Sequence, residues 1–227
     1  MRLLAAAMIA GCWAAPAAAS PFSGEAALVS DFRYRGVSLS DGNPALQAAL
    51  NFEHPSGFHA NLWTSTLRRI GSIGHSEIDV TAGYEREIAK GLFFDLSATR
   101  YFYPSSGSEN YSEGTATLTL EQGAASASLG LSYAPPQRAL CDGLGRRRDN
   151  GYIFGQGGIA LPRIPVTITA SAGYERGAFD EVRNGGKWDW SLGGEFERGP
   201  AKLAMTYVGS TADSGSDALV GTLTLSW

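Results

Sequence analysis

The last ten residues of the chain alternate between two kinds of side chain and end on a tryptophan. In Ala218–Trp227, most odd positions carry leucine or tryptophan, whereas Thr222, Thr224 and Ser226 are polar. Successive side chains of a strand point to opposite faces, so one face of this segment is apolar and the other polar. About ten residues is also the length that a tilted transmembrane strand needs. The segment predicts the closing strand of an outer-membrane β-barrel, with the last strand of a soluble β-sandwich as the alternative.

Residues 1–19 have the pattern of a secretory signal peptide. A short basic start is followed by an apolar run and by small residues before Ser20, as expected for an exported protein. We therefore expect one mature domain, residues 20–227, in the bacterial cell outer membrane. Cys12 also lies in a lipoprotein-like processing sequence, which is the less favoured alternative. If Cys12 is removed, Cys141 is the only cysteine, and neither an internal disulfide nor a cysteine-rich metal site can form.

Composition favours a barrel over other membrane proteins and over nucleic-acid binding proteins. The chain has 29 glycines, 11% aromatic residues and only 18% charged residues. After the signal peptide, no stretch approaches the roughly 18 continuous apolar residues of a transmembrane helix, so a membrane role would have to come from alternating strands. The formal net charge is −4 and no region is strongly basic enough to indicate a nucleic-acid partner.

Alternating segments recur at short, regular intervals through the rest of the chain. The expected fold is all-β: a transmembrane, antiparallel, up-and-down β-barrel of about twelve strands in the bacterial outer membrane. The expected strands are Ser23–Tyr34, Pro44–Glu53, Gly57–Ser65, Ser76–Arg86, Leu92–Tyr103, Tyr111–Glu121, Ala124–Tyr133, Gly151–Leu161, Val166–Glu175, Trp188–Glu197, Ala201–Val208 and Ala218–Trp227.

The connections between these strands are sorted by length. Those after even-numbered strands are tight turns, such as residues 54–56 and 198–200, whereas those after odd-numbered strands are longer and polar, such as residues 135–150 and 209–217. Outer-membrane barrels have short periplasmic turns and long external loops. The sorting therefore predicts a periplasmic C-terminus, with Trp227 as an interfacial anchor and assembly signal.

Parity within each strand separates a lipid face from a lumen face. In Val166–Tyr174, for example, an apolar stripe alternates with Thr167, Thr169 and Ser171. In Gly151–Leu161, the pattern leaves open whether the aromatic or the isoleucine positions face the lipid. The side chains predicted to line the pore are Asp31, Arg33, Arg35, Gln47, Asn51, Asn61, Glu77, Asp79, Glu85, Asp95, Glu113, Asp189 and Glu195. This lumen is polar and mostly acidic, with a basic strip at Arg33 and Arg35.

The first half of the mature chain carries a family signature. Ser30–Gln47, followed by Pro55–Trp63, resembles the opening of the TorF family of porins, also catalogued as Gcw_chp proteins; Glu77–Tyr84, Arg100–Pro104 and Tyr111–Glu113 match in order. The resemblance implies an outer-membrane protein of the porin type and supplies no catalytic residues.

Two interpretations of the signature remain open. In the first, Gly36, Asp41 and Gly42 supply the backbone freedom that turns need, and the segment only forms turns at the outer rim. Alternatively, Arg33 and Arg35 lie at the pore mouth and contact anions or sugars.

Catalysis and cofactor binding find little support. The three histidines, His54, His59 and His75, show no zinc spacing, and no glycine-rich segment opens a helix to hold phosphate. Ser65 and Asn61 share a face with His59 but are spread along one strand, too far apart to form a triad. We expect neither an enzyme nor a protein with a metal or other cofactor.

The one basic cluster is Arg146–Arg148, in the long segment after the seventh expected strand. These arginines would pair with lipopolysaccharide phosphates, remain solvated, or fold into the lumen. The expected partners are outer-membrane lipid and lipopolysaccharide, the barrel-assembly machinery and small hydrophilic solutes.

Together, these features predict a porin-like channel for passive diffusion of small hydrophilic solutes or ions, with a mild cation preference set by the acidic lumen. One alternative is a closed structural or adhesive barrel, plugged by ion pairs such as Arg33 or Arg35 with Glu77 or Asp79. A soluble secreted β-protein is the third and least favoured interpretation.

Overall fold

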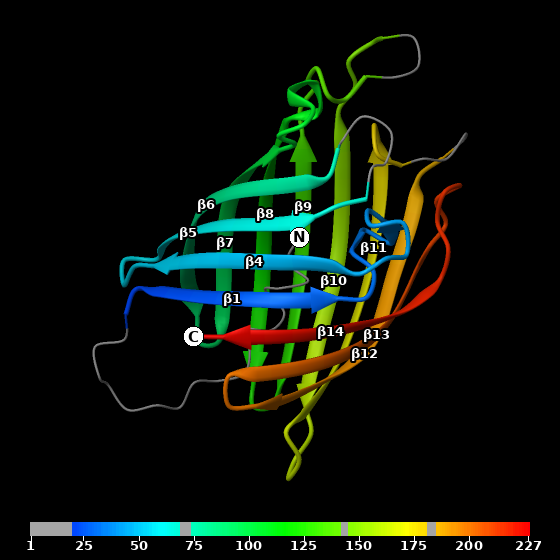
Figure 1. Cartoon of the computed structure of the whole chain (residues 1–227). Helices are drawn as coiled ribbons and strands as arrows, with labels where there is room; N and C mark the ends of the chain where they lie inside the picture. The colour runs from blue at the N-terminus through cyan, green and yellow to red at the C-terminus, as the bar shows by residue number, and fades with distance from the viewer. Residues whose placement is uncertain (1–19, 69–73, 142–144, 181–184) are drawn as a thin grey trace.

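The alternating segments pair into one closed antiparallel wall (Figure 1). The computed structural model describes residues 20–68, 74–141, 145–180 and 185–227, and twelve strands within these residues form the barrel. The strands are β1 (Phe22–Val29), β4 (Ala45–Glu53), β5 (Phe58–Thr66), β6 (Ser76–Ala89), β7 (Leu92–Phe102), β8 (Tyr111–Gln122), β9 (Ala125–Ala134), β10 (Asn150–Ala160), β11 (Val166–Gly177), β12 (Lys187–Arg198), β13 (Ala201–Ser210) and β14 (Ala218–Ser226).

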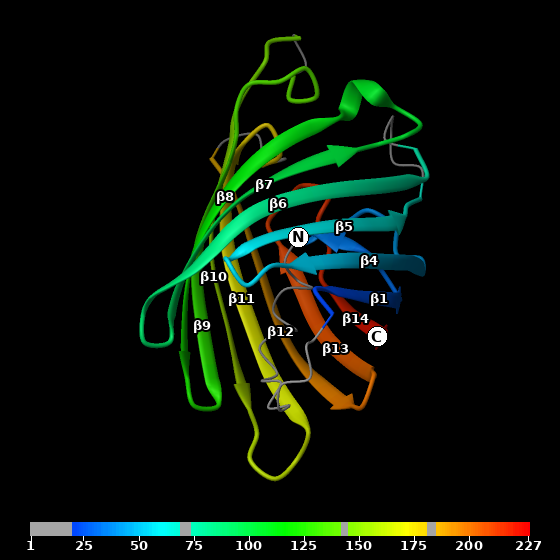
Figure 2. The same cartoon turned by 90° about the vertical axis from the view of Figure 1, so that its left-hand side faces the viewer.

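Each barrel strand pairs with the barrel strands before and after it, and β14 closes the wall against β1 (Figure 2). At the closure, Glu25 pairs with Ser226 and Val29 with Thr222. Closure leaves no unpaired sheet edge, which an open sheet in lipid could not tolerate. The predicted barrel with its C-terminal closing strand is therefore confirmed. No helix among the described residues is long and apolar enough to cross a membrane.

The connections are sorted between the two ends of the barrel as predicted. Residues 30–44, 67–75, 103–110, 135–149, 178–186 and 211–217 join strands at what we call the long-loop end; residues 54–57, 90–91, 123–124, 161–165 and 199–200 join them at the short-turn end. A short 3-10 helix, η2 (Gly107–Glu109), lies in one long loop. The expected signal peptide and Cys12 lie outside the described residues.

The first expected strand was too long. It was predicted to run to Tyr34, but β1 ends at Val29, and the chain then forms a separate two-stranded hairpin, β2 (Arg33–Tyr34) and β3 (Val37–Ser38), drawn in blue beyond the arrowhead of β1 in Figure 1. Val29 pairs with Ala45, and the next residue along that neighbour is Pro44. Proline has no N–H to extend the ladder, so the strand stops there.

Two residues in the turn of this hairpin have an uncommon backbone conformation. Arg35 has φ +47° and Gly36 has φ +81°, the left-handed region in which side chains other than glycine are uncommon. Arg35 is held there by the contacts of its guanidinium group, described below. We call residues 30–43 the inner hairpin segment, because Arg35 contacts strands on the far side of the barrel.

The outer face of the barrel is apolar. Leu46, Leu96, Leu131 and Leu223 are exposed there, as parity predicts, and they provide the band that lipid would cover. The structure decides which side chains of β10 face outward: the isoleucines Ile153 and Ile159 are exposed on the outer face. Its aromatic side chains consequently face inward.

Inside the wall, Phe154 of β10 lies between two glycines. Its ring stacks on Tyr152 at 5.3 Å between centroids, and its register partners are Gly130 on β9 and Gly173 on β11. A Cβ added at Gly130 would lie 2.1 Å from the ring of Phe154. Gly130 leaves the space in which the Phe154 ring packs, and Gly173 does the same for Tyr152, because a Cβ at Gly173 would lie 2.2 Å from the Tyr152 hydroxyl oxygen.

Gly130→Ala is therefore expected to lower the free energy of unfolding by about 1–3 kcal/mol, the usual cost of overpacking a filled interior. Urea unfolding of the barrel in lipid vesicles measures the change. Gly114→Ala is the matched control, because a Cβ there meets nothing closer than 3.9 Å. Equal stability of the two variants would contradict the packing argument.

Candidate functional site in the barrel lumen

The predicted pore-lining side chains divide into three groups by burial. Asp31, Arg33, Arg35, Glu77, Asp79, Asp95, Glu113 and Asp189 are buried; Gln47, Asn51, Asn61 and Glu195 are partly buried; Glu85 is exposed. Those on the barrel strands share the inward parity of their strands, on the side opposite the exposed leucines. The structure thus gathers polar side chains on the inner face, most densely toward the long-loop end.

Arg33 and Arg35 do not lie on a barrel strand, which corrects the predicted extent of strand one; they lie inside the barrel near the long-loop end. Both belong to the inner hairpin segment, because β1 ends at Val29. They also do not pair with Glu77 or Asp79, the partners considered for a plugged barrel. Both arginines have other partners. Arg33 contacts its own segment and a neighbouring loop, whereas Arg35 contacts distant strands.

Arg33 secures the inner hairpin segment to itself and to a neighbouring loop. Its Nε donates to Asp31 Oδ2 at 2.6 Å, and its Nη1 donates to the carbonyl oxygens of Gly36 and Ser216. Asp31 in turn accepts a hydrogen bond from the Ser40 hydroxyl at 3.0 Å. A buried charge needs such a complete set of partners.

Arg35 instead links the segment to two distant strands. Its Nη2 donates to Glu113 Oε1 on β8 at 2.6 Å, and its Nη1 donates to Glu175 Oε1 on β11. Lys187 Nζ of β12 lies 2.7 Å from Glu175 Oε2, and the Arg35 guanidinium lies over the Tyr152 ring, 4.1 Å from its centroid. We call these five residues the Arg35 cluster.

The Arg35 cluster is buried and balanced in charge. Two cations face two carboxylates, and both Arg35 and Glu175 are almost completely enclosed. Burial by itself lowers the pKa of the Arg35 guanidinium, but Tyr34, Glu113 and Glu175 raise it well above its ordinary value. Arg35 therefore stays charged at any physiological pH and binds the segment to the wall.

Aromatic side chains add apolar contacts between the segment and the wall. Phe32 packs on Trp63 of β5 at 5.3 Å between ring centroids, and Tyr34 packs on Tyr101 of β7 at 6.4 Å. Tyr101 stacks on Tyr111 at 4.2 Å. The segment is thus held on several sides and narrows the lumen at the long-loop end.

Several lumen carboxylates lie outside this balanced cluster. Glu77 accepts a hydrogen bond from the Tyr103 hydroxyl at 3.0 Å, and Asp189 accepts one from the Tyr152 hydroxyl at 3.0 Å. Among the described residues, no Lys or Arg forms an ion pair with Glu77, Asp79 or Asp189. The inner face therefore keeps an acidic excess.

His59 pairs with a carboxylate across the wall. Its Nε2 lies 2.6 Å from Asp95 Oδ2 on β7, and the intervening β6 carries Gly83, where a Cβ would lie 2.5 Å from the His59 ring. The described residues contain no group of three or more His, Cys, Asp and Glu that could hold a metal ion. The predicted lack of catalytic function remains a prediction.

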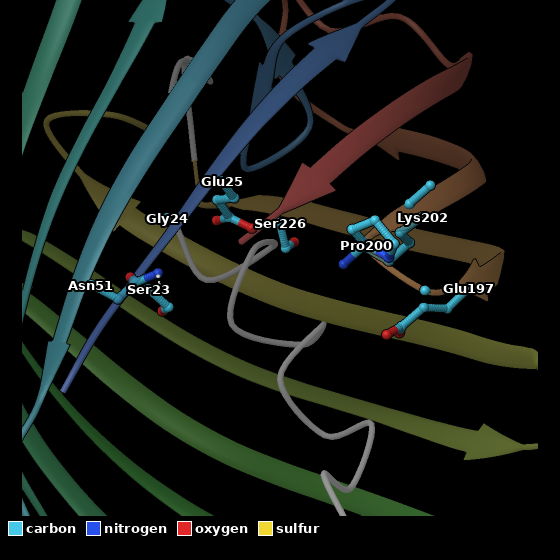
Figure 3. A pocket seen from close by; sticks show the side chains of 10 residues that line it. Ser23, Gly24, Glu25, Asn51, Glu197, Pro200, Lys202 and Ser226 are labelled. Carbon is cyan, nitrogen blue, oxygen red and sulfur yellow. Dashed lines mark hydrogen bonds between the residues drawn. The ribbon is translucent and has the colours of Figure 1, made fainter. Parts of the chain in front are cut away.

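The short-turn end holds a cavity of about 150 Å³ that is lined by polar and charged side chains. Figure 3 shows Ser23, Glu25, Asn51, Glu197 and Lys202 around it, contributed by β1, β4, β12 and β13. Both signs of charge meet at this opening, so it is polar without a strong preference of its own.

Sequence reasoning missed two members of the Arg35 cluster. Lys187 was assigned to a loop, but it begins β12 and shares a face with Asp189. Tyr152 was left open because the facing of β10 was ambiguous. The spacing of Lys187 and Asp189, two residues apart, was the signal that would have placed Lys187 in the lumen.

In sequence, the chain matches the model of one protein family. A family model described as "Bacterial protein of unknown function (Gcw_chp)" matches residues 13–222. No curated protein matches the chain in sequence.

The structure resembles solved porins. It matches a NanC porin with a TM-score of 0.59 and 9% identity, covering 90% of this chain and 97% of that chain. It matches a KdgM porin with a TM-score of 0.60 and 10% identity, covering 90% and 98%. A KdgM porin in complex with disordered oligogalacturonate gives a TM-score of 0.56 at 10% identity, covering 90% and 95%. Identities this low show a shared fold.

Proposed function

The chain belongs to the Gcw_chp family of bacterial proteins of unknown function, and from that premise we propose that it is an outer-membrane porin of the TorF type. It passes small hydrophilic solutes or ions by passive diffusion, with a mild preference for cations. The observation that carries this proposal is the inner face, where buried carboxylates outnumber the cations that neutralise them. An acidic pore wall attracts cations and repels anions.

The inner hairpin segment sets the width of the proposed channel. It enters from the long-loop end and is tied to β8 and β11 through Arg35. Solutes pass through the part of the lumen that the segment leaves open, along the acidic inner face. The same contacts favour a second candidate, a closed barrel that acts in adhesion or envelope structure.

Planar-bilayer recording separates the two candidates. Purified protein is expected to give stepwise increases in conductance. In a KCl gradient, the sign of the reversal potential is expected to show that K⁺ is more permeable than Cl⁻. Protein that inserts into the bilayer without any steps supports the closed barrel. Steps with anion selectivity would leave the channel standing but contradict the role given to the carboxylates.

The surface partners follow from the orientation of the barrel. With the long-loop end outside the cell, the exposed Arg147 and Arg148 lie where lipopolysaccharide phosphates are found. Trp227 lies on the outer face at the short-turn end, where its backbone pairs with Gly24 and its ring covers that glycine. Its indole suits the membrane interface, and this strand end is the proposed signal to the barrel-assembly machinery.

Deletion of Trp227 is therefore expected to lower the amount of protein that resists urea extraction from outer membranes, while leaving the conductance of the inserted molecules unchanged. The reason is that Trp227 faces away from the lumen. Deletion removes the interfacial ring and both backbone hydrogen bonds to Gly24. Trp227→Phe keeps an aromatic ring and the backbone, and serves as the control. Normal insertion of the deletion variant would contradict the assembly role.

A further inference from the structure

Two carboxylates of β6 occupy adjacent inward positions near the long-loop end. Glu77 and Asp79 are 1% and 2% exposed. Residues two apart on a strand lie on the same face at a separation of about 7 Å, so both carboxylates face the same part of the lumen. Neither belongs to the Arg35 cluster, and in the proposed channel they contribute only to the general acidic excess of the inner face.

Three oxygen atoms of this pair have no hydrogen-bond partner. Glu77 Oε1 accepts from Tyr103, but Glu77 Oε2, Asp79 Oδ1 and Asp79 Oδ2 have no partner among the described residues. A buried carboxylate oxygen without a hydrogen-bond partner is disfavoured, because it has lost its contact with water. A cationic ligand in the lumen would remove that cost.

The walls beside the pair are aromatic. Trp63 on β5 and Tyr101 on β7 are the register partners of Asp79 on its two sides, and both are buried. Trp63 Nε1 also has no partner among the described residues. Aromatic walls around a carboxylate suit an organic cation, whose alkyl part packs on rings while its charge meets the carboxylate.

A bare metal ion fits this place poorly. Ca²⁺ takes six to eight oxygen ligands, and the described residues offer no group of three or more metal-binding side chains here. A primary ammonium group carries three N–H donors, which equals the number of unpartnered oxygens of Glu77 and Asp79. A quaternary ammonium has the same charge but no donor.

We propose that Glu77 and Asp79 form a binding site for a small primary-ammonium solute inside the barrel lumen. The ammonium donates to Asp79 and to Glu77 Oε2, and its alkyl part lies beside the rings of Trp63 and Tyr101, which also pack on Phe32 and Tyr34 of the inner hairpin segment. The proposal deepens the channel function and rests on it for its biological role, since the site would select among the permeating cations. Binding itself requires only the folded barrel.

Isothermal titration calorimetry on the purified full-length barrel in detergent tests the site, with butylammonium chloride and tetramethylammonium chloride as probes. Wild-type protein is expected to bind butylammonium roughly tenfold more tightly than tetramethylammonium, because charge-assisted hydrogen bonds are worth that much or more. Equal affinities, or no binding of butylammonium, would overturn the proposal without any variant.

Variants locate the site. Asp79→Asn and Glu77→Gln are each expected to weaken butylammonium binding by roughly tenfold, whereas Glu121→Gln, which removes an exposed carboxylate at the short-turn end, should leave it unchanged. Unchanged binding in Asp79→Asn and Glu77→Gln would place the ligand elsewhere and overturn the assignment.

Bilayer recording distinguishes failure of this site from failure of the channel. If both hold, butylammonium reduces the K⁺ current of wild-type protein more than tetramethylammonium does, and Asp79→Asn removes the difference. Butylammonium binding without any conductance would support the binding site and contradict the channel function. Conductance that the two probes reduce equally keeps the channel and rejects the site.

Discussion

Arg35→Met is expected to be among the most destabilising single substitutions in the protein, lowering the free energy of unfolding by about 3–5 kcal/mol. This is the usual cost of removing one partner from a buried ion pair. Methionine fills similar space but leaves Glu113 and Glu175 without the cation that lies between them. Urea unfolding in lipid vesicles, followed by tryptophan fluorescence, measures the loss.

Two comparisons make this result specific. Arg86→Met removes an exposed arginine from β6 and should change stability by no more than about 0.5 kcal/mol, as surface substitutions usually do. Adding Glu113→Gln to the Arg35→Met variant removes the carboxylate that is left without a cation, while Lys187 still neutralises Glu175, and should restore part of the stability. If Arg35→Met is as stable as Arg86→Met, Arg35 does not bind the inner hairpin segment to the wall.

Replacing the inner hairpin segment, residues 30–43, by a turn of about four glycine and serine residues should increase the unitary conductance. Hairpin loops of two to five residues are common, and Val29 and Ala45 are already paired neighbours. The barrel strands therefore keep their register. We expect the conductance to rise by roughly a factor of two or more, because the segment occupies part of the cross-section that carries ions.

The shortened protein has its own control. The same glycine and serine turn inserted in place of residues 212–215, which lie in the β13–β14 loop, changes the sequence of a long loop without removing the segment or its contact Ser216, and should leave the conductance near the wild-type value. Heat-modified mobility on gels reports that both barrels are folded. An unchanged conductance after removal of residues 30–43 would show that the segment does not restrict the passage.

The facing of most strands could be predicted because it is a local property. Period-two alternation assigns each side chain to one face, and a wrong register would place charge against lipid. Glu77, Asp79, Asp95 and Glu113 were all placed inward by this argument, and all are buried. β10 could not be assigned because both of its faces carry large apolar residues, and the choice depends on Gly130 and Gly173 in the neighbouring strands.

The candidate site was predicted less well, for a different reason. Sequence parity assigns Arg35 to the lumen by extending strand one through it, whereas the structure buries Arg35 in the inner hairpin segment, where strand parity does not apply. Pro44 was the local signal that the β1 ladder stops at Val29, and it was used only to place the head of the next strand. The partners of Arg35, which are 78 and 140 residues away, depend on which strands lie opposite one another once the barrel closes.

The sequence alone therefore determined the closed β-barrel, its apolar outside, its polar and acidic inside, and the sorting of long and short connections. Each of these follows from alternation and from turn chemistry within a few residues. Only the tertiary structure decided that residues 30–43 enter the lumen, that Arg35 joins Glu113 to Glu175, and that Glu77 and Asp79 keep unpartnered oxygens. These outcomes depend on charges that meet across the barrel, and no local pattern records which charges will meet.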